Sequence, residues 1–183
     1  MKKISIRKWC ILFWVLIVMG NHVLAQDKES KEDLQVTLTK AAREIMTSAK
    51  TCNLITIDVD GSPRARTMDP LEPESDFTVW MGTNPKSRKV AQIKNNPAVT
   101  LYYLDHDSSG YVLIRGKAVI VDDQQEKENH WKDAWKPFYS DKEKDFVLIR
   151  VSPEWMEVIS NTRGIIGDPT TWKAPKVLFD HEN

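Results

Sequence analysis

Hydrophobic positions recur with two different periods along the chain. Up to residue 50 apolar side chains return every three or four positions, as on one face of an amphipathic helix, at Leu34, Leu38, Ala41, Ala42, Ile45 and Ala49. From Cys52 the period changes to two, and β-branched residues alternate with others as they do in a strand. The pattern predicts a helix from Asp33 to near Lys50, followed by a region rich in β-structure.

Short strands separated by turn signals make up most of this second region. Residues 52–59 end at Asp60-Gly61, a strong turn signal, and are expected to form a β-hairpin with residues 64–68. Gly116 lies inside another expected strand and marks a bulge or a close approach of two backbones. The remaining strands are expected over residues 77–82, 99–104, 111–121, 146–151 and 155–159, the last two around a Ser152-Pro153 corner.

Two further helices and a tail complete the expected elements. Asn84-Pro85 turns the chain, Ser87 can cap a short helix, and Asn95-Asn96-Pro97 ends it. An acidic helix is expected over residues 122–135, and the tail, residues 161–183, is expected to be irregular. Many strands with a few peripheral helices favour one domain of the α+β class, mainly β, built as a closed β-barrel.

The first 25 residues have the layout of a secretory signal peptide. Basic residues come first, an apolar run shorter than a membrane span follows, and Val-Leu-Ala offers a cleavage site before Gln26. Export by a Sec-type route to the periplasm or medium is expected, with retention as an N-terminal anchor as the alternative. Residues 26–33 are charged and lack apolar anchors, which suits a flexible lead-in to the domain.

Charge and cysteine content narrow the possible functions. Cleavage would remove four of the 26 basic residues and none of the 26 acidic ones, leaving 22 against 26, a mildly acidic balance that argues against nucleic acid as the partner. Cys52 would be the one cysteine left, so an intramolecular disulfide is impossible, and it is expected to be a small buried hydrophobe. His106, His130 and His181 have no ligand-like spacing, so no metal site is expected.

Basic and hydroxyl side chains gather at two places in the chain. Arg64 and Arg66 leave one face of their expected strand, because side chains in a strand alternate. The segment Thr83 to Lys89 brings hydroxyls and cations to the start of a helix, a combination suited to a phosphate dianion. Basic helix starts are common, however, so the same residues could instead be the solvated start of a surface helix, and spacing alone does not settle which interpretation holds.

Ordered motifs over residues 35–160 resemble a known family. Thr83-Asn84-x-x-Ser87-Arg88-Lys89-x-x-Gln92-Ile93-x-Asn95-Asn96-Pro97 resembles a segment of the pyridoxamine 5'-phosphate oxidase family, the FMN-binding split barrels. Three other segments are more similar to the general stress protein 26 branch of that superfamily. They are Arg64 to Met68 after Gly61-Ser62-Pro63, the expected strand 111–121 with Gly116-Lys117-Ala118, and Leu148 to Glu154.

The resemblance implies a fold, a cofactor and a set of contacts. The fold is a six-stranded split β-barrel of Greek-key type over residues 34–160, assembled as a homodimer with FMN in two clefts at the interface. It implies flavin and phosphate contacts from Arg64, Arg66, Thr67 and Met68. The ribityl phosphate would be held by Thr83, Ser87, Arg88 and Lys89, and Tyr111 would reach the flavin from the neighbouring subunit.

The function implied is that of an exported FMN-dependent oxidoreductase whose substrate is unknown. The family's C-terminal Arg-x-His motif does not follow Trp155-Met-Glu-Val-Ile, so oxidation of pyridoxamine phosphate itself is not expected. No general acid, base or nucleophile stands out, and the redox chemistry would belong to the flavin. The alternatives are a non-catalytic flavin-binding stress or carrier protein, and a binder of haem or a deazaflavin; haem would require His106 or His130 as axial ligand.

Overall fold

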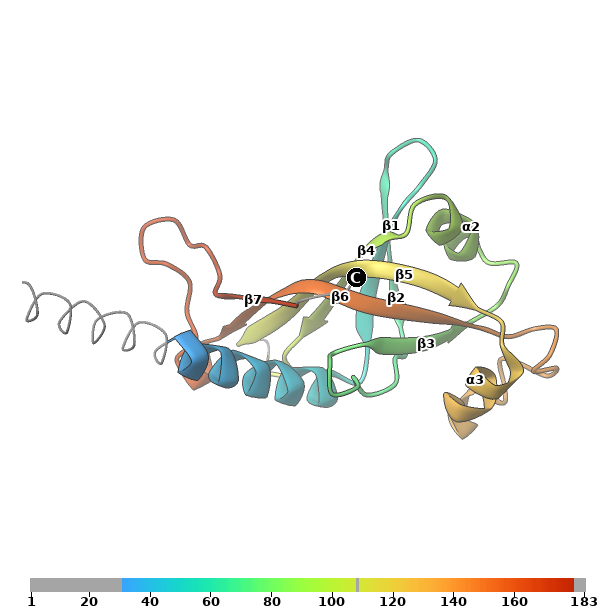
Figure 1. The fold of residues 1–183 in the computed structure, drawn as a ribbon, viewed down its shortest axis with the longest axis horizontal. Coiled ribbons are helices and arrows are strands. Elements are labelled where there is room, and N and C mark those ends of the chain that lie inside the picture. The colour runs from blue at the N-terminus through green and yellow to red at the C-terminus, as the bar shows by residue number, and fades with distance from the viewer. Residues whose placement is uncertain (1–30, 108, 180–183) are drawn as a thin grey trace, which may run out of the picture. The chain divides into compact units, whose positions relative to one another are not determined.

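The computed structural model describes residues 31–107 and 109–179 (Figure 1). The first helix is described over residues 31–49, which confirms the expected helix. The expected signal peptide, residues 1–25, lies outside the described residues. The lead-in expected over 26–33 is helical where it is described, at residues 31–33. No helix within the described ranges is long and apolar enough to cross a bilayer. Residues from Leu38 onward form one compact unit, and residues 31–37 belong to another.

One antiparallel sheet organises the compact unit (Figure 1). The described residues form seven strands in the order β2-β1-β4-β5-β6-β3, and β7 also pairs with β6. The strands are β1 (Cys52–Ile57), β2 (Pro63–Met68), β3 (Val79–Thr83), β4 (Ala98–Leu104), β5 (Gly110–Val121), β6 (Val147–Ser160) and β7 (Lys176–Leu178). The mainly-β α+β class is confirmed, whereas six strands and barrel closure are not, because the sheet has seven strands and β2 and β3 are not paired as strands.

The expected corner at Ser152-Pro153 is wrong, because β6 runs through it without a break. The pairing of β5 with β6 shifts register between Arg115 and Gly116, so that Gly116 lies opposite Pro153 while Arg115 lies opposite Trp155. A proline has no N–H to give to a ladder, and a bulge is one of the places in a sheet where it is tolerated. The expected bulge at Gly116 is thereby confirmed, and it explains how Pro153 stays within the strand.

Close backbone approach makes glycine necessary at this bulge. A Cβ placed on Gly116 would lie 2.2 Å from the carbonyl oxygen of Ser152, and it would also lie 3.2 Å from the Cα of Pro153. Both neighbours are backbone atoms of the paired strand, so relief would require the strands to separate.

The acidic helix expected over residues 122–135 is much shorter in the structure. Helix α3 (Gln124–Asn129) begins after Asp123, whose side chain accepts the Glu126 N–H, and a 3-10 turn over Asp133–Trp135 follows an extended Lys132. The Asp69 carboxylate binds both Lys132 Nζ at 2.6 Å and Trp135 Nε1 at 2.7 Å. These contacts with a distant loop hold residues 132–135 outside a continuous helix.

The tail is less irregular than expected. Strand β7 pairs antiparallel with β6, with Leu178 opposite Trp155. Before it, the Asp168 side chain accepts hydrogen bonds from the Thr170 and Thr171 N–H groups, which forms a tight turn. Pairing with β6, the preceding strand in the chain, accounts for the difference, because the composition of the tail does not encode this pairing.

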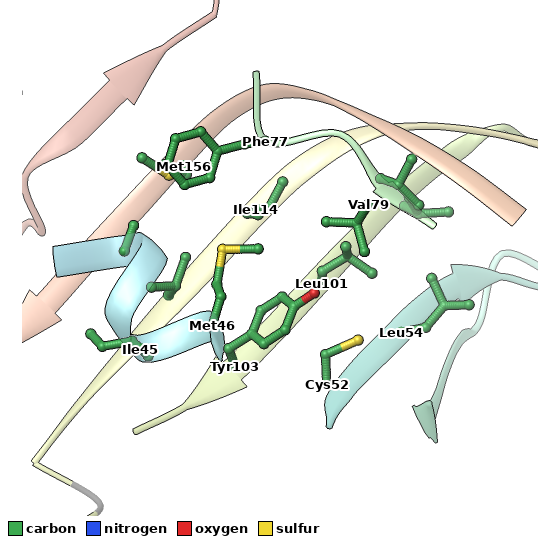
Figure 2. Packing of buried hydrophobic residues seen from close by; sticks show 14 of the residues in the cluster. Ile45, Met46, Cys52, Leu54, Phe77, Val79, Leu101, Tyr103, Ile114 and Met156 are labelled. Carbon is green, nitrogen blue, oxygen red and sulfur yellow. The ribbon is translucent and has the colours of Figure 1, made fainter. Parts of the chain in front are cut away.

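The core lies between the sheet and the helix that precedes it (Figure 2). Figure 2 shows Met46 of that helix beside Tyr103 of β4, with Met156 of β6 and Phe77 next to each other above the helix in this view. Arg43 anchors the helix by donating to the carbonyl oxygens of Pro73, Glu74 and Ser75 at 2.9 to 3.1 Å. The buried helix residues are Leu38, Ala41, Ala42, Ile45 and Met46.

Substitution of Gly116 by alanine is expected to lower the free energy of unfolding by about 1–3 kcal/mol, because the new methyl group meets backbone atoms of β6. Urea denaturation measures the change. The exposed neighbour Lys117 changed to alanine is the control, and its effect should stay within about 0.5 kcal/mol. A Gly116→Ala protein as stable as wild type would contradict the close approach.

Candidate functional site

Basic and hydroxyl side chains converge where β3 ends and helix α2 (Arg88–Asn95) begins. The Asn84 side chain accepts the Lys86 N–H at 2.8 Å, and the Ser87 N–H returns to the Asn84 carbonyl at 3.0 Å. This turn brings the Ser87 hydroxyl to 3.2 Å from that of Thr83. Ser87 occupies the N-cap position, but its side chain makes no capping hydrogen bond. The hydroxyl therefore belongs to the site and not to the helix end.

Lysine and arginine side chains complete the group, which we call the cationic cluster: Arg66, Thr83, Ser87, Arg88 and Lys89. Lys89 is half-buried, and its Nζ donates to Thr83 Oγ1 at 3.0 Å. Arg66 reaches the same region from β2, and its charge acts on Lys89. A strand and a helix start that are about twenty residues apart in the chain thus supply one site.

Neutral partners hold the Arg66 guanidinium. Its Nη1 donates to Thr56 Oγ1 at 2.6 Å, and its Nη2 donates to Gln92 Oε1 at 2.9 Å. Thr56 in turn donates to Gln92 Oε1 at 2.7 Å. Thr56 is fully buried and Gln92 is 4% exposed. Arg66 is therefore fixed in direction while its charge is left without a carboxylate partner in this contact.

Burial and mutual repulsion perturb the cations of the cluster. Partial burial, and then the charge of Arg88, lowers the pKa of Arg66, and the charge of Asp58 opposes this shift only in part. Partial burial, and then the charge of Arg66, lowers the pKa of Lys89. Among the ion pairs found in residues 31–107 and 109–179, none includes Arg66, Arg88 or Lys89. The cluster has a local excess of positive charge, which an anion would relieve.

The other residues implied by the resemblance lie outside the cationic cluster. Arg64 is directed to carboxylates at the hairpin turn, with its Nε 3.0 Å from Asp58 and its Nη2 3.8 Å from Asp60. Met68 is 8% exposed and belongs to the hydrophobic core. Side chains alternate along a strand, so Arg64 and Arg66 share one face of β2. Arg64 lies nearer the hairpin turn, and the two arginines therefore meet different partners.

Two surface cavities contain the remaining expected contacts. Thr67 lines one of about 330 Å³ together with Asn53, Tyr102 and His106. Tyr111 lines the other, of about 430 Å³, with Ile159, Ile166 and Trp172. The rings of Tyr102 and Tyr111 stack with centroids 5.4 Å apart. Thr67 and Tyr111 therefore line different cavities. The two cavities are neighbours, because Tyr102 lines the first and stacks on Tyr111, which lines the second.

Sequence reasoning missed Thr56 and Gln92 as members of the site. Thr56 takes a core-facing position in β1, after Cys52 and Leu54, and Gln92 sits between the buried Val90 and Ile93 of α2. A polar residue at an inward position needs a hydrogen-bond partner, and that is a usable signal. The partner itself, Arg66, could not be identified from spacing.

Acidic and histidine side chains also meet at the end of β4. Asp105, His106 and Asp107 place possible ligand atoms within 4.8 Å of one another. The buried Asp105 carboxylate already accepts Arg163 Nη1 at 3.0 Å and lies 3.1 Å from His106 Nδ1. We assign these residues to a structural network that ties β4 to the turn after β6.

The remaining histidine and cysteine among the described residues are engaged in packing. His130 stacks on Trp80 with centroids 3.9 Å apart, and its Nδ1 lies 3.1 Å from Glu126 Oε2. Cys52 is 2% exposed, and burial raises the pKa of its thiol to about 12, far above neutrality. Neither environment suits an axial ligand or a nucleophile.

Comparison with known proteins places the chain in a family. Residues 36–168 match the family model described as pyridoxamine 5'-phosphate oxidase like. The match covers more than half of the chain, and the protein belongs to this family. No curated protein gives a significant match.

Solved structures show the same fold. General stress protein 26 from Bacillus anthracis str. Sterne is 26% identical with a TM-score of 0.58, over 69% of this chain and 93% of that one. A Clostridium acetobutylicum protein related to general stress protein 26 of B. subtilis is 22% identical with a TM-score of 0.65, over 80% and 96%. A pyridoxamine 5'-phosphate oxidase-related, FMN binding protein from Nostoc punctiforme is 13% identical with a TM-score of 0.55, over 82% and 96%. The expected similarity to the general stress protein 26 branch is confirmed.

Proposed function

We propose that the protein binds FMN and that the cationic cluster holds its phosphate. The observation that carries the proposal is the positive charge of Arg66, Arg88 and Lys89, none of which forms an ion pair within the described residues; the charge of Asp58 acts on Arg66 from beyond ion-pair distance and is the weakest of the three effects on it. Two hydroxyls, from Thr83 and Ser87, lie beside these cations. A phosphate dianion accepts hydrogen bonds from this set of groups, and the start of an α-helix favours it further. The structural neighbour from Nostoc punctiforme is itself described as FMN binding.

The flavin ring would extend from this phosphate toward the other expected contacts. We propose that Arg64, Thr67 and Met68 lie along the flavin and that Tyr111 reaches it from a second subunit, as the family resemblance implies. The homodimer belongs to the same proposal. It is supported by large apolar side chains that are exposed in the single chain, among them Leu104 at 48% and Leu178 at 70%.

We also propose that the sheet is the split barrel of the family. The isolated bridge between Pro70 and Met81 supports this, because Pro70 follows the end of β2 and Met81 lies in β3. The Leu71 N–H donates to the Trp80 carbonyl at 2.8 Å in the same place. These contacts bring the two ends of the strand order next to each other.

The proposed activity is that of an FMN-dependent oxidoreductase with an unidentified substrate. FMN supplies a ring that accepts and returns electrons when it is bound. The contribution of this chain would be to bind the phosphate through the cationic cluster and to orient the ring. A non-catalytic flavin carrier is the alternative, and haem or a deazaflavin is favoured less. Haem has little support, since His130 is packed against Trp80 and His106 contacts Asp105.

Export is a further part of the proposal. Its support is the basic start and apolar run of residues 1–25. An exported protein would function with FMN in the periplasm or outside the cell.

Replacing Arg66 or Lys89 by alanine should weaken FMN binding by at least about tenfold, because each change removes a charge that faces the phosphate. Riboflavin, which has no phosphate, should lose much less affinity. Fluorescence titration of the purified protein with FMN and with riboflavin measures both constants.

The control for this experiment is Lys94→Ala. Lys94 is a basic residue of the same helix, in its last turn and exposed. Its loss should leave both affinities unchanged. Wild-type protein that binds no FMN at micromolar concentrations would disprove the proposal.

The preference for FMN over riboflavin should fall as the pH rises from neutrality toward 10.5, the ordinary pKa of a lysine. Burial lowers the pKa of Lys89, so its charge is present near neutrality and is lost at a lower pH than that of an exposed lysine. Below about pH 6 the preference should also fall, because the phosphate takes up a proton. The ratio of the two affinities, measured across this range, tests the expectation.

Lys89→Arg serves as the comparison for the pH dependence. A guanidinium keeps its charge throughout this range, so the variant should keep its preference for FMN at high pH. An identical decline in wild type and variant would mean that Lys89 is not the titrating group.

Turnover distinguishes the oxidoreductase from the carrier. With the flavin bound, NAD(P)H or another donor should be oxidised faster than by the same concentration of free FMN, because the bound ring is oriented and shielded. Absorbance of the donor follows the reaction. Rates equal to those of free FMN with every donor and acceptor tried would favour the carrier.

A further inference from the structure

Two buried neutral side chains hold the arginine of the cationic cluster. We call Thr56 and Gln92 the neutral clamp. Gln92 Oε1 accepts from Thr56 Oγ1 at 2.7 Å and from Arg66 Nη2 at 2.9 Å, while Thr56 Oγ1 accepts from Arg66 Nη1 at 2.6 Å. Because Thr56 gives its proton to Gln92, its oxygen is left to accept from Arg66. The three contacts form a closed ring that sets the direction of the guanidinium.

The clamp is placed so that its members have few alternative positions. Thr56 is 0% exposed near the end of β1, opposite Arg64 and two residues from the position opposite Arg66. Gln92 is 4% exposed on the buried side of α2, next to Ile93. Strand and helix therefore hold the clamp from both sides, and Arg66 enters between them from β2. The remaining N–H groups of Arg66 are left for another acceptor.

The absence of charge in the clamp is its unusual property. An arginine that is partly buried is usually paired with a carboxylate, and glutamate has the same shape as glutamine. A glutamate at residue 92 would pair with Arg66 and cancel the charge that the site offers to a ligand. Glutamine keeps the geometry and leaves the charge. Arg64, two residues earlier on the same strand, is by contrast ion-paired with Asp58 and Asp60. Asp58 also accepts a hydrogen bond from the Gln92 side chain, but it acts on Arg66 from beyond ion-pair distance.

We propose that Gln92 and Thr56 are positioning residues that determine the selectivity of the site for a phosphorylated flavin over an unphosphorylated one. They fix Arg66 with neutral acceptors that do not cancel its positive charge, so this charge and its remaining donors face the phosphate. The proposal rests on the proposed FMN binding. It goes beyond it by assigning selectivity to two residues that do not themselves contact the ligand.

Gln92→Glu is the decisive variant. We expect the ratio of FMN to riboflavin affinity to fall at least about tenfold, since the new carboxylate neutralises Arg66 and repels the phosphate. Riboflavin affinity should stay within about twofold of wild type. The thermal unfolding of the flavin-free protein is measured beside the affinities to show that the variant is folded, because the new carboxylate gains Arg66 but loses the hydrogen bond from the Gln92 side chain to Asp58. A purely structural role for Gln92 would weaken both flavins equally.

Lys94→Gln is the matched control. It changes the net charge by the same amount as Gln92→Glu, on the same helix, but at an exposed position in the last turn. Its ratio of affinities should equal that of wild type. If it lowers the ratio as much as Gln92→Glu does, long-range charge and not the clamp sets the selectivity, and the proposal is overturned.

A pair of Thr56 variants tests the clamp without adding charge. Thr56→Val removes the hydroxyl at nearly constant shape, and Thr56→Ser keeps it. The valine variant should lower the ratio of FMN to riboflavin affinity, and the serine variant should restore it. The pair also decides the matter if Gln92→Glu does not fold.

The outcomes separate the two proposals. Wild-type protein that binds neither flavin overturns the proposed function and the inference with it. Wild-type protein that prefers FMN, together with Gln92→Glu and Thr56→Val proteins that keep the same preference, overturns the inference alone and leaves the proposed function standing.

Discussion

The pairing of β5 with β6 is the constraint on which the rest of the structure depends. These long strands run side by side from Gly110 to Val121, and β4, β3 and β7 each attach to one of them. The bulge at Gly116 lets the pair continue past Pro153, where the strands would otherwise have to separate. Helix α2 packs against β5 and β1. The bulged pair thus supports the framework that brings the start of α2 up to β2.

The cationic cluster is built against local electrostatic preference. Positive charge at the start of a helix is unfavourable, and α2 has no acidic residue in its first turn. Arg66 and Lys89 repel each other, and neutral groups hold both of them. Such an arrangement is retained more easily when a ligand supplies the missing negative charge. Among the features of the described residues, this unpaired positive charge is the one that most directly supports binding of an anion.

Local sequence patterns predicted most elements but failed where distant contacts decide. The helix at 31–49, the first hairpin and the bulge at Gly116 follow from periodicity and turn residues. The helix expected over 122–135 is shortened because Asp69 binds Lys132 and Trp135. The predicted corner at Pro153 was wrong because β5 pairs with β6 on both sides of this residue. The tail was predicted to be irregular, but part of it pairs with β6 as strand β7. In each case a contact with another segment of the chain overrides local propensity.

The sequence by itself determined the residue types of the site and its family. The residues of the motif from Thr83 to Pro97 are neighbours in the chain, so the motif could be recognised from the sequence. Its resemblance to the family suggested a phosphate-binding corner. Only the tertiary structure decided which cations belong together. Arg64 and Arg66 look equivalent in the sequence, but Arg64 meets Asp58 and Asp60, whereas Arg66 meets Thr56 and Gln92. Pairing of β1 with β2 and packing of α2 against β1 set these partners, and neither can be read from the spacing of residues along one strand.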